Sequence, residues 1–215
     1  MRSRAIKLTI LAAVTSFIWA CGGDDSDDGG GGGGGGSGEM CSIKACGGDP
    51  AGDWTVTDVC VSNPTKLFAA TVNAEACASA LKTATNIKGS GGYKLGTDKS
   101  AMSTIAVSGT AMFSFNDACA KALGIAEVAA TDCAKIQEAF TKEKAVKSAN
   151  CAAAGANCDC TITSDISLAG NGSYTVSGTE LTVMSLKQPF CVDGKELSIQ
   201  TTASGATLTF TLSKM

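Results

Sequence analysis

Apolar and polar residues alternate along much of this chain, and a period of two is typical of β-strands that bury one face. The first alternating stretch is DWTVTDVCV, residues 53–61. In it Trp54, Val56 and Cys60 share one face, and threonines lie on the other. The folded part of the chain is therefore predicted to begin with a strand.

The same alternation continues downstream. Residues 91–115 alternate on both sides of a turn at 97–100 and predict a hairpin. From residue 158 to the C-terminus, six short runs are separated by turn residues, and connections this short join antiparallel neighbours. Together these stretches predict a mainly β fold, an antiparallel up-and-down meander of eight to ten strands that closes into a barrel, because closure removes bare strand edges. The six runs are CDCTITSDISL, GSYTV, TELTVMSL, PFCV, KELSIQT and ATLTFTLS.

Two regions lack this pattern and are predicted to be helical. Residues 65–85 are rich in alanine, with Asn73 placed to cap a short helix. Residues 116–157 are predicted to form a helical insert, capped at Asn116 and Thr131. In its second helix an apolar stripe would pack against the rest of the fold, and disulfides would attach the insert. The stripe consists of Cys133, Ile136 and Phe140.

The N-terminus has the pattern of an export signal. Arg2, Arg4 and Lys7 precede the apolar residues 8–20, which as a helix of 13 residues would span about 20 Å. A bilayer core is about 30 Å thick, so residues 1–20 are predicted to be a signal peptide and not a membrane span. Residues 21–40 are rich in Asp and Gly and predict a flexible tether.

The end of this segment, Ile18-Trp19-Ala20-Cys21, resembles the lipobox of bacterial lipoproteins, with Ile18, Ala20 and Cys21 matching. The resemblance implies cleavage before Cys21 and attachment of fatty acyl chains such as palmitate to that cysteine. Gly22 follows in place of the aspartate that retains lipoproteins in the inner membrane. The implied location is the outer membrane of a Gram-negative bacterium, facing the periplasm or the surface. The alternative is an ordinary signal peptide with Cys21 in a disulfide.

Eleven cysteines indicate an oxidising compartment. With Cys21 lipidated, ten remain as disulfide candidates, enough for five bridges. Cys158 and Cys160 lie two residues apart on a predicted strand and so point to one face, where two thiolates could bind a soft metal or exchange disulfides. The alternative, which we favour, is that each is bonded to a separate cysteine. The ten candidates are Cys41, Cys46, Cys60, Cys77, Cys119, Cys133, Cys151, Cys158, Cys160 and Cys191.

Gly52-Asp53-Trp54 at the first strand resembles the Gly-x-Trp signature of lipocalins, and the units YTVSGTELTV and FCVDGKELSI resemble those of bacterial lipocalin-like lipoproteins. The resemblance implies a lipocalin-like domain over residues 41–215 with a ligand cavity in its barrel. Lipocalins stack a late arginine on this Trp, and Lys214 is the nearby cation here. Aromatic residues could line the cavity, or they could simply pack the core. They are Trp54, Tyr93, Phe113, Phe115, Tyr174, Phe190 and Phe210.

Composition narrows the possible functions. The chain has no histidine, its only arginines are Arg2 and Arg4, and its net charge is −3. We therefore predict no nucleic-acid partner, no metal, no cofactor, no catalytic residues and no enzymatic activity. Two hypotheses remain. One is a lipid-anchored envelope lipoprotein that binds a small apolar ligand or serves as an envelope component. The other is a cysteine-rich protein-interaction module displayed at the cell surface.

Overall fold

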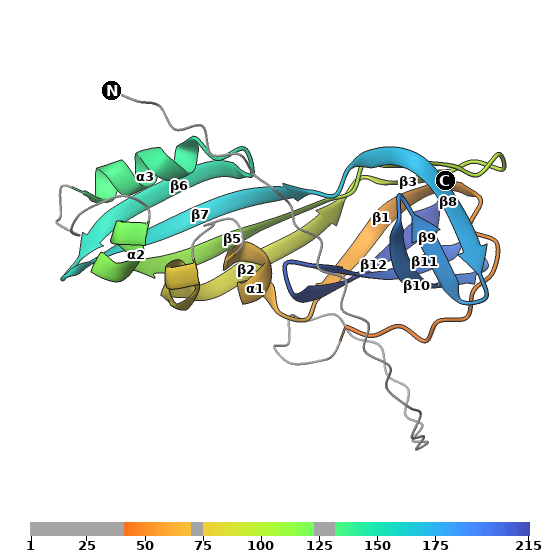
Figure 1. Cartoon of the computed structure of the whole chain (residues 1–215), viewed down its shortest axis with the longest axis horizontal. Coiled ribbons are helices and arrows are strands. Elements are labelled where there is room, and N and C mark those ends of the chain that lie inside the picture. The colour runs from red at the N-terminus through yellow and green to blue at the C-terminus, as the bar shows by residue number, and fades with distance from the viewer. Residues whose placement is uncertain (1–40, 70–74, 123–131) are drawn as a thin grey trace, which may run out of the picture. The chain divides into compact units, whose positions relative to one another are not determined.

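The alternating stretches form twelve antiparallel strands in the part of the chain that the computed structural model describes, residues 41–69, 75–122 and 132–215. Short helices join some of the strands (Figure 1). The predicted signal peptide, the lipobox cysteine Cys21 and the tether lie outside the described residues, as do the predicted caps Asn73 and Thr131.

Eight of the strands form a closed barrel, which confirms the prediction of an antiparallel closed meander. Around the barrel the strands follow one another in chain order, and the last strand pairs with the first through seven residue pairs from Trp54–Lys214 to Val61–Leu208. No strand of the barrel therefore has a free edge along its full length. The barrel strands are β1 (Gly52–Val61), β3 (Gly92–Leu95), β4 (Ser100–Ser103), β8 (Gly170–Ser177), β9 (Glu180–Val183), β10 (Leu186–Asp193), β11 (Glu196–Ala203) and β12 (Ala206–Lys214).

The other four strands form a second sheet in the order β2-β5-β7-β6, which the sequence did not predict. Three of them are continuous in the chain with barrel strands, so the two sheets share these chain segments (Figure 1). Strands β2 and β7 lead into the barrel strands β3 and β8, and the barrel strand β4 leads into β5. The predicted hairpin at 91–115 is thus correct at its turn, but its second strand divides between the barrel and this sheet. The bounds are β2 (Leu81–Ser90), β5 (Ala106–Phe115), β6 (Val146–Ala154) and β7 (Asn157–Ser167).

One face of the second sheet is buried beneath helices, and the opposite face is exposed or half-buried. Phe113 and Phe115 of β5 pack against Phe140 of α3, with ring centroids between 5.3 and 6.4 Å apart. This alternation along β5 places a cluster of aromatic rings on the buried face of the sheet. The helices are α1 (Pro64–Ala69), the 3₁₀ helix η2 (Glu75–Ala80), α2 (Asp117–Ala122) and α3 (Cys133–Thr141).

Two helical predictions are wrong in part. The helix expected over 65–85 is restricted to α1 and η2, and Leu81 begins strand β2. The insert at 116–157 contains α2 and α3, but α3 ends at Thr141 and residues 146–154 form strand β6. These residues include Ala149 and Ala152–Ala154, which favour a helix intrinsically. Pairing with β7 along the whole of β6 overrides that preference.

A bulge changes one predicted face. The pairing of β1 with β12 shifts between Val56 and Asp58, which adds a residue to β1. Cys60 therefore leaves the face of Trp54 and is exposed. There it bonds to Cys41.

The segment before β1 lies against the outside of the barrel. The N–H groups of Cys46 and Gly47 donate to the carbonyl of Phe190 at 3.1 and 3.0 Å, and Val192 donates to Gly47 at 2.8 Å. These hydrogen bonds satisfy backbone groups of β10 at Phe190 and Val192, past the residues that pair with β9. Disulfides Cys41–Cys60 and Cys46–Cys191 attach the segment covalently to β1 and β10.

Candidate functional site

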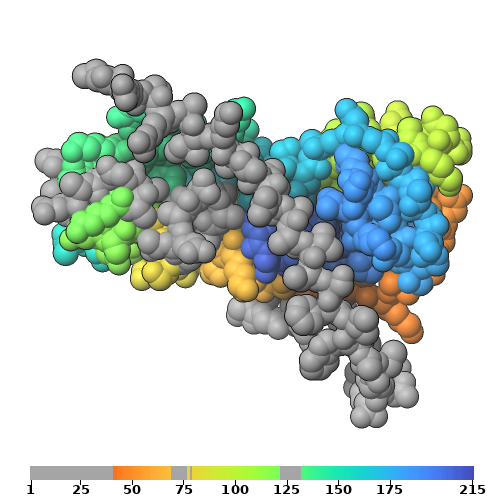
Figure 2. Space-filling model, viewed as in Figure 1, coloured from red at the N-terminus to blue at the C-terminus, as the bar shows by residue number. Residues whose placement is uncertain are grey.

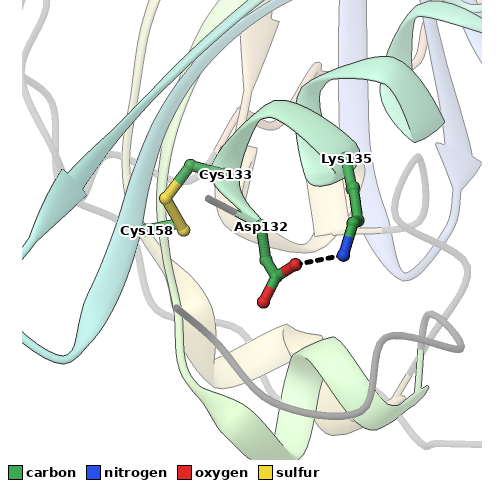
Figure 3. A network of polar contacts seen from close by, with 4 residues as sticks. All are labelled: Asp132, Cys133, Lys135 and Cys158. Carbon is green, nitrogen blue, oxygen red and sulfur yellow. Dashed lines mark hydrogen bonds and ion pairs between the residues drawn. A yellow bond between two sulfur atoms is a disulfide. The ribbon is translucent and has the colours of Figure 1, made fainter. Parts of the chain in front are cut away.

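All ten cysteines of the described chain are paired in five disulfides, as predicted for an oxidising compartment. Cys158 bonds to Cys133 at the start of α3, beside the ion pair of Asp132 with Lys135 (Figure 3). Its neighbour Cys160 bonds to Cys151 on β6. Since both sulfurs are in bridges, neither is a thiolate that could bind a metal. Cys77–Cys119 joins η2 to α2.

The seven aromatic candidates do not line one cavity. Phe113 and Phe115 belong to the second sheet. The other five come from barrel strands, and all seven are buried, with Tyr93 the most exposed at 8%. The aromatic residues are therefore divided between the barrel and the second sheet, within one continuous hydrophobic core. The five in the barrel are Trp54, Tyr93, Tyr174, Phe190 and Phe210.

The barrel interior is filled by side chains from all eight strands. Figure 2 shows one face of the outer surface, on which the C-terminal part of the chain is coloured blue. Barrels of this size can either fill themselves with side chains or hold one small ligand, and this one is of the filled kind. Besides the aromatic residues, the buried side chains include Val56, Leu95, Leu181, Val183, Leu197, Ile199, Leu208 and Leu212.

A buried polar cluster lies within this apolar interior, and the sequence analysis missed it. Burial raises the pKa of the Tyr93 phenol, while hydrogen bonds from Gln188 and Ser103 act in the opposite direction. Gln188 is 3% exposed, and its Oε1 has no hydrogen-bond partner among the described residues. The signal that could have revealed it is a glutamine two residues before Phe190, on the buried face of a strand.

At one end of the barrel Trp54 is held from two sides. Its indole N–H donates to the Pro50 carbonyl at 2.7 Å. Lys214, its pairing partner on β12, places its Nζ 5.3 Å from the ring centroid, within the range of a cation–π contact. The cation beside Trp54 is thus a lysine, Lys214, and not an arginine.

The outer surface of the barrel carries a hollow of about 350 Å³ over β1, β3 and β4, which we call the glycine groove. Asp53, Lys94 and Met102 are successive partners across these three strands and form one side of it. The lining residues are Asp53, Trp54, Thr55, Gly91, Gly92, Tyr93, Lys94, Met102, Thr104 and Met215.

A second hollow, of about 380 Å³, lies between the N-terminal segment and strands β10–β12. Its lining is polar and includes Lys44 together with the carboxylates Asp193 and Glu196, which face each other across a turn. Within the described ranges no group of three or more His, Cys, Asp or Glu side chains gathers as a metal site would require. Two carboxylates beside a lysine give a mixed, solvated surface.

The described helices are all too short or too polar to cross a bilayer. Comparison with known proteins identified no matching family model, no matching curated protein and no matching solved structure.

Proposed function

We propose that this chain is a lipid-anchored lipoprotein of the cell envelope whose barrel acts as a rigid scaffold for binding another protein. The observation that carries the proposal is the filled barrel. Phe190 is fully buried, and Trp54 and Phe210 are at most 2% exposed. A ligand carrier needs an internal cavity, typically of about 300–1,000 Å³, and side chains occupy that space here. The hollows described above lie on the outer surface, where a partner can reach them.

The proposal includes a lipocalin-like architecture for the barrel. Support comes from the chain order of its strands, from Gly52-Asp53-Trp54 at the start of β1, and from the cation of Lys214 beside that Trp. Lipocalin-like barrels need not be carriers, because function resides in particular sites and not in the fold.

Anchorage at Cys21 in the outer membrane belongs to the same proposal. It rests on the lipobox sequence. Five disulfides fit a protein that folds in the periplasm or at the surface, since cytosolic thiols remain reduced.

Metabolic labelling with radioactive palmitate tests the anchor. The wild-type chain should carry label and sediment with the outer membrane, and the Cys21→Ser variant should carry none. A wild-type protein without label would overturn the proposed anchor.

Native mass spectrometry and site-specific photo-crosslinking together test the scaffold. Protein extracted from cells should have the mass of the acylated chain alone. A photoreactive residue placed at exterior positions such as Lys94 or Lys187, both well exposed, should give one discrete crosslinked protein from a subset of positions. A stoichiometric small-molecule adduct would favour a carrier instead, and crosslinks that do not depend on position would contradict the scaffold.

A further inference from the structure

We propose that residues 41–49, which we call the strap, form a redox-sensitive latch on the barrel. Reduction of the two disulfides of the strap releases it, while the barrel and the second sheet stay folded. The strap is the thin orange trace ahead of β1 in Figure 1. One bridge, Cys41–Cys60, attaches it to β1, and the other, Cys46–Cys191, attaches it to β10. The latch goes beyond the proposed scaffold function and does not depend on it.

The two bridges of the strap are the ones that a reductant in solution can reach. Thiol–disulfide exchange requires access to a sulfur atom of the bridge. Among the five bridges of the described chain, only the two on the strap include an exposed cysteine. The other three lie in the second sheet and its helices, where every cysteine is buried except the half-buried Cys151. The exposed cysteines are Cys60, bonded to Cys41, and Cys46, bonded to Cys191.

The reaction is an exchange with a dithiol reductant. One thiolate of the reductant attacks Sγ of Cys46, the bond to Cys191 breaks, and Cys191 leaves as a thiolate. The second thiolate of the reductant then displaces Cys46 and closes the reductant's own disulfide. Two electrons pass from the dithiol to the bridge, and the two cysteines take up the protons that the dithiol released. The same exchange opens Cys41–Cys60 from its exposed side, at Cys60.

Without its bridges the strap is held by few contacts. Three backbone hydrogen bonds join it to β10, and the Cys41 carbonyl accepts hydrogen bonds from the side chains of Gln200 and Thr209. Between these attachments, Ser42 and Lys44 are exposed and border the polar hollow of about 380 Å³. Hydrogen bonds that water can replace contribute little net stability. The covalent bridges therefore decide whether the strap stays in place.

The strap has a hinge at the end that leads into β1. The indole N–H of Trp54 donates to the Pro50 carbonyl at 2.7 Å, and both residues are buried. Ahead of Pro50, Gly47 and Gly48 have φ angles of 75° and 108°, which glycine adopts without steric cost. Release therefore stops at Pro50, and β1 keeps its pairing with β3 and β12.

Release changes the barrel in two ways. The Phe190 carbonyl and the Val192 N–H lose their partners on the strap, which leaves part of β10 as an open strand edge. The nine freed residues also provide about 30 Å of additional chain when fully extended. Reduction therefore lengthens the connection between the barrel and the part of the chain that precedes residue 41.

Limited reduction of the full chain with dithiothreitol, the probe dithiol, tests the order in which the bridges open. Free thiols are alkylated after an acid quench and are located by peptide mass spectrometry. We expect both strap bridges to open at least tenfold faster than the three bridges of the second sheet. A bridge of the second sheet that opens as fast as either strap bridge would overturn the latch.

Hydrogen exchange followed by NMR on this partly reduced protein tests release of the strap. The Val192 amide should lose protection, because its acceptor is the Gly47 carbonyl at 2.8 Å. The Val56 amide of β1, which donates to the Gly91 carbonyl at 2.9 Å, should stay protected. Retained protection at Val192 would show that the strap stays in place without its bridges. Loss of protection at Val56 would show that the bridges hold the whole barrel, and either result contradicts the latch.

Matched serine variants make the same test without a reductant. Cys46→Ser with Cys191→Ser should expose the Val192 amide to exchange as in the reduced wild type. Cys151→Ser with Cys160→Ser removes a bridge of the second sheet and should leave that amide protected until dithiothreitol is added. Equal protection of Val192 in the two variants would refute the latch. If the first variant does not fold, the partly reduced wild type still decides.

Discussion

The Tyr93 phenol and the Gln188 amide stabilise each other inside an apolar barrel. Replacing one member of a buried polar pair leaves the other unsatisfied, which costs about 1–3 kcal/mol. We therefore predict that Tyr93→Phe lowers the free energy of unfolding by about that amount.

The double variant Tyr93→Phe with Gln188→Leu should recover part of this loss, since it removes the buried amide that would otherwise lack its tyrosine partner. Urea denaturation of the wild type, both single variants and the double variant gives the coupling free energy. Independent, additive effects would contradict the pairing.

Titration of Tyr93 provides a second prediction. Burial raises the pKa of its phenol, so the folded protein keeps the proton to higher pH than the unfolded chain, whose tyrosines ionise near pH 10. The folded state then binds more protons above that pH, and stability falls as the pH rises through this window. The difference in tyrosinate absorbance between the wild type and Tyr93→Phe should show ionisation above pH 10. A difference curve centred at or below pH 10 would be inconsistent with a buried phenol.

For single residues, the sequence predicted burial more accurately than it predicted the sheet to which each buried residue belongs. The alternation around Trp54 and Phe210 correctly indicated burial. It could not separate Phe113 from the barrel residues, because a period of two is the same in both sheets. Gln188 was missed because it lies between the predicted runs TELTVMSL and PFCV, whereas strand β10 begins at Leu186 and includes it. Cys60 was misplaced because a bulge has no reliable sequence pattern.

Among the elements, β6 and β2 are the edges of the second sheet, and exposed edges invite pairing with other chains. On β2 a bulge between Thr85 and Lys88, with Asn86 at φ 54°, interrupts the edge. On β6 the N–H of Cys151 donates to the side chain of Gln137, which reaches over from α3 at 2.9 Å. Both edges are thus partly protected.

We predict that Gln137→Ala uncovers the β6 edge. The variant should lose about 1 kcal/mol of stability and should aggregate faster below its unfolding midpoint. Light scattering during heating measures the second effect.

Glu138→Ala is the matched control, because the side chain of this neighbour on α3 is exposed and forms an ion pair with Lys142 at 2.7 Å. It should leave aggregation unchanged. Similar aggregation of the two variants would show that α3 as a whole, and not the contact with Cys151, protects the edge.

The predicted elements were most accurate where turns were short. From Gly170 onward each turn joins neighbours, and the alternation indicated strands correctly except in the run TELTVMSL, which a turn at Met184 and Ser185 divides between β9 and β10. Between residues 65 and 157 the predicted elements were less accurate. Thr83, Thr85 and Ile87 are β-branched and could have indicated β2, whereas β6 is largely alanine and small polar residues. Only pairing with β7, the next strand along the chain, makes β6 a strand, and the residue pattern of β6 alone does not show that pairing.

Across the whole molecule the five disulfides should contribute unequally. In the loop-entropy description, a bridge that closes a longer loop stabilises more. Cys46–Cys191 spans 145 residues and Cys151–Cys160 spans 9, which corresponds to about 5 and about 2.6 kcal/mol. Replacing the first pair with alanines should therefore lower the denaturation midpoint more than replacing the second. A larger loss from the second pair would indicate that the native contacts of β6 dominate.

Closure of the barrel was predictable because the first and last strands were both recognised in the sequence. The second sheet was not, because its strands continue barrel strands without an intervening turn. β4 and β5 are separated only by Thr104 and Ile105, and β7 and β8 only by Leu168 and Ala169. A strand that passes from one sheet to another has the same alternation as one long strand. The glycine groove escaped prediction for a related reason, since it depends on which residues of β1, β3 and β4 are opposite one another.

The two bridges at the beginning of the folded part have a mechanical consequence. Traction applied to the chain ahead of Cys41 meets a covalent link to β1 and, five residues later, another to β10. Hydrogen bonds along β1 are therefore not unzipped one at a time. The applied force is shared between strands β1 and β10 of the closed barrel. Single-molecule stretching from that end should record a rupture force that drops sharply once a reductant is added.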